Sequence, residues 1–137
     1  MPKPPPRWLV RANVAMLAKG LRVGSQHLLT VRGRLTGEPR RTPVSIARVN
    51  GERFVVAAFE SADWVANVRA AGFGTLTRGA DVEVVRLVEL PVLERAPVLR
   101  ALLEQVPGGR RFFDTPEPDR VIASAERYPV FRVTPPA

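Results

Sequence analysis

The sequence contains no cysteine and a single histidine, His27. Without cysteine the chain cannot form a disulfide, a thiolate zinc site, an iron–sulfur cluster or a thiol nucleophile. One histidine without clustered carboxylates does not indicate a metal site either, so we expect no bound metal. The absence of cysteine is compatible with the reducing cytoplasm, which is the location we expect.

Long hydrophobic runs are also missing, and no stretch approaches the roughly 18 apolar residues that a membrane span needs. Residues 8–21 follow a basic start but are interrupted by Arg11, Asn13 and Lys19, so they do not form the apolar region of a signal peptide. The chain has no G-x-S-x-G, no GxxxxGK[ST] and no GxGxxG. These absences argue against a hydrolase and against the common nucleotide-binding loops.

What the chain does have is positive charge: 21 Lys and Arg face 13 Asp and Glu, for a net charge of +8. Nucleic acid, an acidic membrane surface and a phosphorylated small molecule all fit this charge. Aromatic residues make up only 7% and are not interleaved with basic ones, which argues against nucleic acid. Something anionic is therefore the expected partner, and the charge alone does not choose its kind.

The length of 137 residues, 45% of them hydrophobic, suits one globular domain. Residues 1–7 carry four of the 14 prolines and are expected to form a disordered tail, which leaves 8–137 as a single domain. Apolar residues recur with helical spacing from Trp8 to Leu21, with Arg and Lys between them. This predicts a basic amphipathic helix, which is suited to peripheral contact with a membrane.

The rest of the chain predicts short strands in hairpins with helices inserted between them. Residues 27–31, 42–50 and 53–59 read as three consecutive antiparallel strands, and Asn50-Gly51 supplies a strong hairpin turn. Ser61 is a candidate N-cap for a helix that Gly72 ends. A second hairpin (75–78 and 81–90), helices at 94–106 and 118–126, and a strand at 129–133 follow. The fold class is α+β, with about six mostly antiparallel strands in a small barrel or strongly curved sheet.

The segment from Gly33 to Pro43, GRLTGEPRRTP, joins the first two predicted strands and is rich in arginine. Arginine suits phosphate and carboxylate because its planar fork donates two parallel hydrogen bonds. Gly33 and Gly37 permit a tight turn that approaches a ligand closely. An anion site and a solvated charged loop both fit this pattern.

Two further candidates come from single side chains. Trp64 and Asn67 lie three residues apart on a predicted helix and share a face, so both are available to one planar polar ligand. A core anchor and a surface amide are the alternative. Tyr128, the only tyrosine, precedes the last strand and is a candidate proton donor or a packing residue.

The order of these features resembles the deazaflavin-dependent nitroreductase family. The resemblance covers residues 8–135 and is carried by the loop GRLTGEPRRTPV, the Trp64-x-x-Asn67 helix and the closing segment YPVFRVTP at 128–135. It implies a split β-barrel that binds coenzyme F-420, a deazaflavin with a phosphate and an oligoglutamate tail. Leu35 stands where the family's loop usually has a basic residue.

The resemblance also implies roles for individual residues. Arg34, Thr36, Gly37, Arg40 and Arg41 would meet the phosphate or the glutamyl tail. The remaining pocket residues would lie near the ring: Thr42, Pro43, Val44, Ala57, Ala58, Phe59, Trp64 and Asn67.

The implied activity is hydride transfer between F-420 and an electron-poor small molecule, such as a quinone, an enone or a nitro compound. Such an enzyme has to hold the ring and neutralise the tail, which agrees with the lack of a catalytic motif. Tyr128 or a water is the candidate proton donor. An FMN-binding or haem-binding protein on the same barrel, and a non-enzymatic binder of anions or nucleic acid, are the alternatives. A monomer or a homodimer fits the sequence, and residues 8–21 and 107–113 are expected to line the substrate side.

Overall fold

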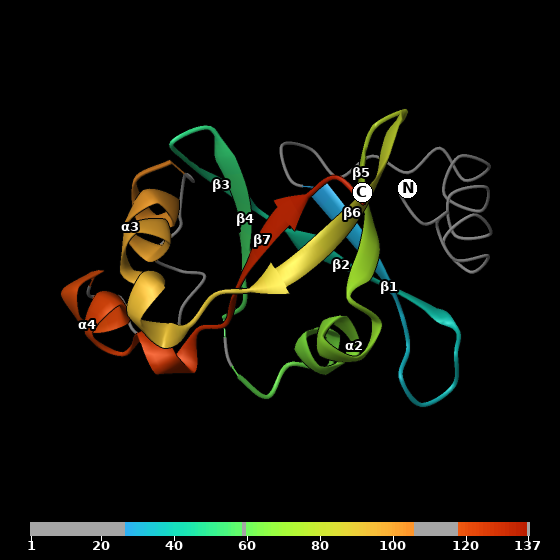
Figure 1. The fold of residues 1–137 in the computed structure, drawn as a ribbon, viewed down its shortest axis with the longest axis horizontal. Coiled ribbons are helices and arrows are strands. Elements are labelled where there is room, and N and C mark those ends of the chain that lie inside the picture. The colour runs from blue at the N-terminus through green and yellow to red at the C-terminus, as the bar shows by residue number, and fades with distance from the viewer. Residues whose placement is uncertain (1–26, 59, 106–117, 137) are drawn as a thin grey trace.

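The computed structural model describes residues 27–58, 60–105 and 118–136, and these form a curled antiparallel sheet with helices beside it (Figure 1). The strands are β1 (His27–Arg32), β2 (Pro39–Val44), β3 (Ile46–Val49), β4 (Glu52–Val56), β5 (Phe73–Arg78), β6 (Asp81–Glu89) and β7 (Val130–Thr134). The helices are α2 (Asp63–Ala71), α3 (Ala96–Gln105) and α4 (Pro118–Ala123), with the 3-10 turns η1 (Val92–Glu94) and η3 (Ala125–Arg127).

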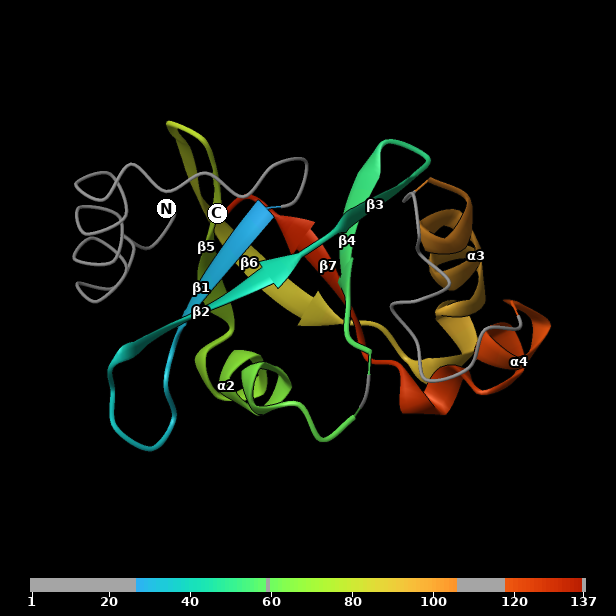
Figure 2. The same cartoon turned by 180° about the vertical axis from the view of Figure 1, so that it is seen from behind.

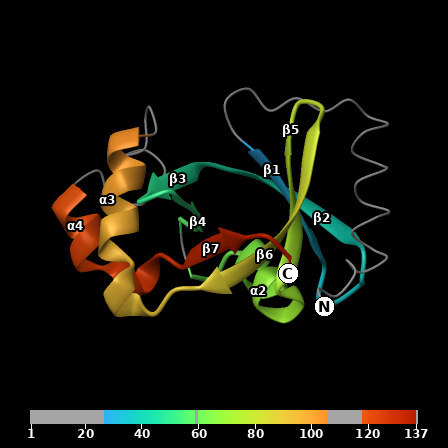
Figure 3. The same cartoon turned by 45° about the horizontal axis from the view of Figure 1, so that its top comes forward.

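The seven strands follow the order β2-β1-β5-β6-β7-β4-β3, and every neighbouring pair is antiparallel. The two edge strands, β2 and β3, are consecutive in the chain, so the sheet must curl until its edges approach each other. Figure 3 shows the result, with β2 and β3 along one side of the fold and β6 and β7 along the other. The predicted α+β split barrel is confirmed.

The predicted strand over residues 42–50 is wrong as one continuous element, because the chain leaves the ladder at Ser45. Before Ser45 it pairs with β1, and after it with β4 at the opposite edge of the sheet (Figure 2). Alternation of apolar residues continues across the break and hides it. Pro39 and Pro43 lie on the edge strand β2, where their missing N–H groups weaken pairing with another chain.

Strand alternation divides the core in two. The inner face of the sheet packs against α2 through one apolar cluster that includes Leu29, Val31, Leu76 and Phe131. The outer face at the other end of the sheet packs against α3 and α4 through a second cluster that includes Phe54, Val130 and Tyr128. The two helix groups therefore cover different faces, with α2 beside β1 and β5.

Helix α2 begins one residue later than the sequence predicts. Its N-cap is Ala62, without a side-chain cap bond, so Ser61 does not cap it. It ends as predicted at Gly72, whose φ of 75° places it in the left-handed region that favours glycine. The helix predicted from residue 94 is instead η1 followed by α3, and the helix predicted over 118–126 ends at Ala123 before η3.

The proline-rich tail, the helix predicted over 8–21, Phe59 and residues 107–113 lie outside the described residues. In the part of the chain that the structure describes, no helix is long and apolar enough to cross a membrane.

A buried guanidinium joins the two halves of the fold. Arg95 is 5% exposed and donates hydrogen bonds to the carbonyl oxygens of Leu90 (3.1 Å) and Ala125 (3.1 Å) and to Glu89 Oε2 (3.0 Å). Glu89 also accepts two bonds from Arg69 on α2, at 2.8 and 2.7 Å. Glu89 thus connects α2 with the segment that precedes α3.

We predict that Arg95→Met destabilises the protein by about 3 kcal/mol, because it removes the buried donor of the Leu90 and Ala125 carbonyl oxygens and of Glu89. Arg53→Met is the control: Arg53 also makes a two-point ion pair, with Glu83 at 2.7 Å, but Glu83 is 46% exposed. Its loss should cost less than about 1 kcal/mol. Denaturant unfolding at pH 7 measures both values, and equal losses would contradict the assignment.

The hydrogen bonds from Arg69, helped by the charge of Arg95, hold the pKa of Glu89 below its usual range, although burial opposes this. A lowered carboxyl pKa stabilises the fold above the unfolded-state value of about 4.3 and stops doing so as the pH falls through the folded-state pKa. We therefore predict that the stability gap between the protein and Glu89→Gln closes on acidification below about pH 4. Denaturant midpoints measured from pH 7 to 3 test this, and a constant gap would refute it.

Candidate functional site

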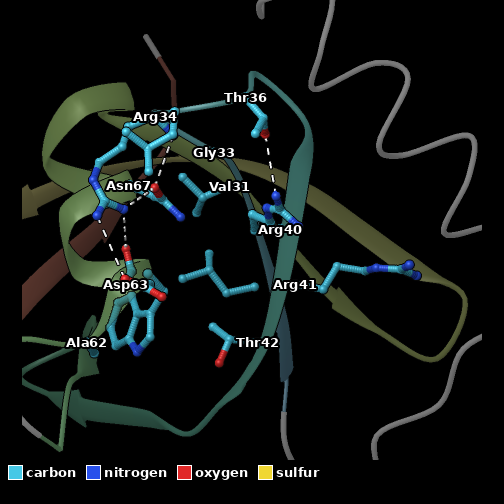
Figure 4. A pocket seen from close by; sticks show the side chains of 13 residues that line it. Val31, Gly33, Arg34, Thr36, Arg40, Arg41, Thr42, Ala62, Asp63 and Asn67 are labelled. Atoms are coloured by element: carbon cyan, nitrogen blue, oxygen red, sulfur yellow. Dashed lines mark hydrogen bonds and ion pairs between the residues drawn. The ribbon is translucent and has the colours of Figure 1, made fainter.

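A pocket of about 530 Å³ lies where the β1–β2 loop faces the first turns of α2 (Figure 4). Its volume falls in the range of small-molecule sites. The described residues that line it are Leu29, Val31, Gly33, Arg34, Leu35, Thr36, Arg40, Arg41, Thr42, Ala62, Asp63, Trp64 and Asn67. Three arginines thus face one carboxylate, so the pocket favours an anion.

The loop that forms one wall is closed by its own backbone. Gly37 N donates to Gly33 O at 2.9 Å, and Gly33 N donates to Glu38 O at 2.7 Å. This single helical turn needs a left-handed residue at its end, which Gly37 supplies with a φ of 78°. Among the described residues, the amides of Leu35 and Thr36 have no acceptor, so two adjacent N–H donors remain at the tip of the loop.

Thr36 adds a hydroxyl donor to the same place. Its Oγ1 accepts hydrogen bonds from Glu38 N at 3.2 Å and from an Arg40 guanidinium nitrogen at 3.4 Å. A hydroxyl has two lone pairs and one proton, so both of its acceptor positions are taken. The Thr36 proton is left to donate to a ligand.

The alternation of β2 separates two arginines that are adjacent in sequence. In the ladder Arg40 pairs with Val31 and Thr42 with Leu29, so both share the face of the apolar inner cluster. Arg41 pairs with Thr30 and belongs to the opposite face. Its guanidinium extends away from Thr36 and Arg40 (Figure 4). Of the two residues expected to meet the anion, Arg40 is therefore the one directed toward Thr36.

Asn67 joins α2 to the loop. Its Oδ1 accepts hydrogen bonds from the backbone N of Arg34 at 3.0 Å and from the guanidinium of Arg34 at 2.9 Å. The same guanidinium lies 3.4 Å from the carbonyl oxygen of Asp63 and 3.7 Å from its carboxylate. Asn67 is 5% exposed and lies within α2, so the alternative interpretation of a cap or surface residue is wrong.

The other wall of the pocket is apolar. Leu29 and Val31 come from β1, and Trp64 comes from the first turn of α2. The Trp64 ring packs against Phe131, with 5.8 Å between ring centroids, and so its position is fixed by the core. Trp64 is therefore both a core anchor and a pocket residue. The site as a whole offers polar donors at one end and a flat apolar surface at the other.

Several residues predicted for the site are not among those that line the pocket. Val44 and Ala57 are buried in the inner cluster, Pro43 is exposed on β2, Ala58 is half-buried, and Gly37 shapes the loop from outside the lining.

Tyr128, the predicted proton donor, is completely buried in the cluster beneath α3 and α4. It packs there because the outer face of the sheet meets these helices. Its position does not support a catalytic role. His27 lines a different pocket at the other end of β1, where burial and then the nearby Arg78 lower its pKa.

The sequence reasoning missed Leu29, Val31, Ala62 and Asp63, which line the pocket. Leu29 and Val31 read as ordinary core residues, and only the open edge of the inner cluster reveals their second role. Asp63 could have been found, because it precedes Trp64 on the helix that carries the predicted pair.

A curled antiparallel barrel with an anion pocket at a helix start is the architecture of split-barrel cofactor-binding proteins. Solved structures share the fold. One described as a domain-swapped dimer is 23% identical, with 93% of this chain and 98% of that chain covered and a TM-score of 0.60. Another, an "F420-H2 Dependent Reductase (FDR-A)", is 22% identical, with 84% and 100% covered and a TM-score of 0.59.

A haem-binding protein from Mycobacterium smegmatis is 12% identical, with 96% of this chain and 52% of that chain covered and a TM-score of 0.55. Likenesses of this level show the fold alone. The comparison with curated proteins finds no match.

The family model described as "F420H(2)-dependent quinone reductase" matches residues 6–111, and the chain belongs to this family. The chain is thus an oxidoreductase of the deazaflavin-dependent class, as the sequence resemblance predicts.

We predict that Asp63→Asn raises the affinity of the pocket for a small anion about threefold, because one exposed negative charge about 6 Å away costs roughly 0.7 kcal/mol in water. Asp63 is the acid that faces the lining arginines, and its side chain is 93% exposed. Calorimetric titration with inorganic pyrophosphate measures the change. Asp81→Asn, on the distant β5–β6 turn, is the control, and an equal gain there would show only a net-charge effect.

Proposed function

We propose that this protein transfers a hydride from reduced coenzyme F-420 to a quinone or a related electron-poor molecule. The observation that carries the proposal is the division of the pocket into a donor-rich end and an apolar wall. A deazaflavin coenzyme has the same division, because an anionic tail is attached to a planar ring.

The residues present fit such a coenzyme by the chemistry of their donors. The Arg40 guanidinium, the Thr36 hydroxyl and the Leu35 and Thr36 amides would bind phosphate or carboxylate oxygens. The backbone donors partly replace the basic side chain that Leu35 does not provide. Leu29, Val31 and the fixed Trp64 indole would hold the ring.

The reaction needs little from ionisable side chains. When bound, the reduced deazaflavin supplies the hydride. A quinone that accepts a hydride also needs one proton to become the quinol, and we propose that solvent provides it, since Tyr128 is enclosed in the core. The protein's contribution is to position the ring and to neutralise the tail.

Nothing at the pocket favours the haem alternative. His27 is the only histidine of the chain, and it lines a different pocket from Trp64 and Arg34. A haem iron would therefore lack a histidine ligand at this site. FMN has one phosphate and no oligoglutamate, so comparing FMN with F-420 under the same conditions separates the two flavin-type cofactors.

The decisive experiment pairs two variants that remove the same charge. We predict that Arg40→Ala weakens F-420 binding by about tenfold, whereas Arg41→Ala weakens it by less than about threefold. Coenzyme fluorescence measures both dissociation constants. Equal losses would show a general charge effect, and no saturable binding of F-420 to the unmodified protein would overturn the proposal.

Substrate class is tested separately, by mixing the protein with reduced F-420 and menadione under anaerobic conditions and following coenzyme oxidation. A quinone reductase oxidises the coenzyme in step with quinol formation. Turnover of a nitroaromatic or an enone with no turnover of any quinone would reassign the substrate. Light scattering decides between the monomer and the homodimer, both of which the sequence allows.

A further inference from the structure

We propose that Arg34 is a positioning residue with two effects. It fixes the side-chain amide of Asn67 so that the NH₂ group of Asn67 faces the ligand, and it ties the loop to α2. The sequence resemblance implies instead that Arg34 itself meets the phosphate or the tail. The inference refines the proposed function, since the identity of the ligand rests on that proposal, while the lock is a property of the protein alone.

The orientation of the Asn67 amide follows from the number of lone pairs on its oxygen. The Asn67 Oδ1 has two, and Arg34 occupies both through its backbone N and its guanidinium. An amide held by two donors at 3.0 and 2.9 Å cannot rotate by 180° without placing its own N–H groups against them. Only the Nδ2 group of Asn67, with two donors, remains for the pocket that Asn67 lines.

Part of the positive charge of Arg34 is balanced by groups of the protein itself. The guanidinium is directed toward α2, where it lies 3.4 Å from the Asp63 carbonyl oxygen and 3.7 Å from the Asp63 carboxylate (Figure 4). Its side chain is 33% exposed. Among the described residues, Arg40 on β2 has the Thr36 hydroxyl as its hydrogen-bond partner and no carboxylate. Arg40 is thus better placed than Arg34 to neutralise an anion.

The bonds between Arg34 and Asn67 hold the N–H donors of the β1–β2 loop in place. Among the described residues, the loop is attached to β1 and β2 at its ends and makes hydrogen bonds to α2 through Arg34. Without that attachment, the Leu35 and Thr36 amides would lose their fixed distance from Asn67. Arg34 and Asn67 therefore act as one unit, and once Asn67 is removed the further loss of the Arg34 guanidinium should have little effect on the site.

The lock is tested first on the protein without any ligand. Amide hydrogen exchange of Arg34, followed by NMR, should accelerate about tenfold in Asn67→Ala, because its acceptor is removed. In Asn67→Asp the carboxylate still accepts both bonds, so exchange should stay slow. Unchanged exchange in Asn67→Ala would overturn the proposal, whether or not the protein binds F-420.

The second test is a double-mutant cycle on the dissociation constant for pyrophosphate, repeated with F-420. Asn67→Ala should weaken binding about tenfold, Arg34→Met should weaken it less because its backbone N still donates to Asn67, and the double variant should bind about as Asn67→Ala does. Arg100→Met on α3 is the control for charge and should bind normally. Losses that multiply would show that Arg34 and Asn67 are independent ligands, which contradicts the positioning role.

The Asn67→Asp variant separates the attachment of the loop from the donation of hydrogen bonds to the ligand. It keeps the loop attached but offers a carboxylate oxygen where the amide offered hydrogen-bond donors, so pyrophosphate binding should fall at least as far as in Asn67→Ala. Normal binding by Asn67→Asp would show that the amide donors do not face the ligand. If the unmodified protein binds pyrophosphate but not F-420, the positioning role stands and the proposed coenzyme is wrong.

Discussion

The carbonyl oxygen of Asn67 holds together the two walls of the pocket. It receives two hydrogen bonds from Arg34, one from the backbone and one from the guanidinium, and the guanidinium also donates to the carbonyl oxygen of Asp63 at the start of α2. The helix in turn is fixed by Trp64 against Phe131 and by Arg69 on Glu89. The position of the donors at the loop tip therefore depends on the core through a short series of contacts.

The curl of the sheet makes this arrangement possible. Because β2 and β3 are consecutive yet lie at opposite edges, the sheet curls, and a pocket lies where the β1–β2 loop faces α2. Leu29 and Val31 then serve the core and the pocket at once. The second helical group, α3 and α4, packs on the outer face, and Arg95, which directly precedes α3, connects through Glu89 to α2. The site is thus supported from both faces of one sheet.

Much of this could be predicted from the sequence, for physical reasons. The Asn50-Gly51 turn, the Gly72 helix end and the arginine-rich loop are local signals, and each lies where the sequence predicts. The break at Ser45 could not be predicted, since alternation is the same on both sides of it. Which of Arg40 and Arg41 shares the face of the inner cluster depends on the pairing register, and the burial of Tyr128 depends on where α3 and α4 pack. Both features arise only when the chain folds, so the sequence pattern does not reveal them.

The central claim is that the loop tip, Arg40 and the Asn67 amide bind the anionic part of the coenzyme while Arg34 stays on Asn67. A crystal structure of the protein with oxidised F-420 tests it most directly. The account predicts the phosphate within hydrogen-bond distance of the Thr36 hydroxyl and the Leu35 and Thr36 amides, with both Arg34–Asn67 bonds retained. A phosphate bound by a released Arg34 guanidinium, or bound outside this pocket, would contradict it.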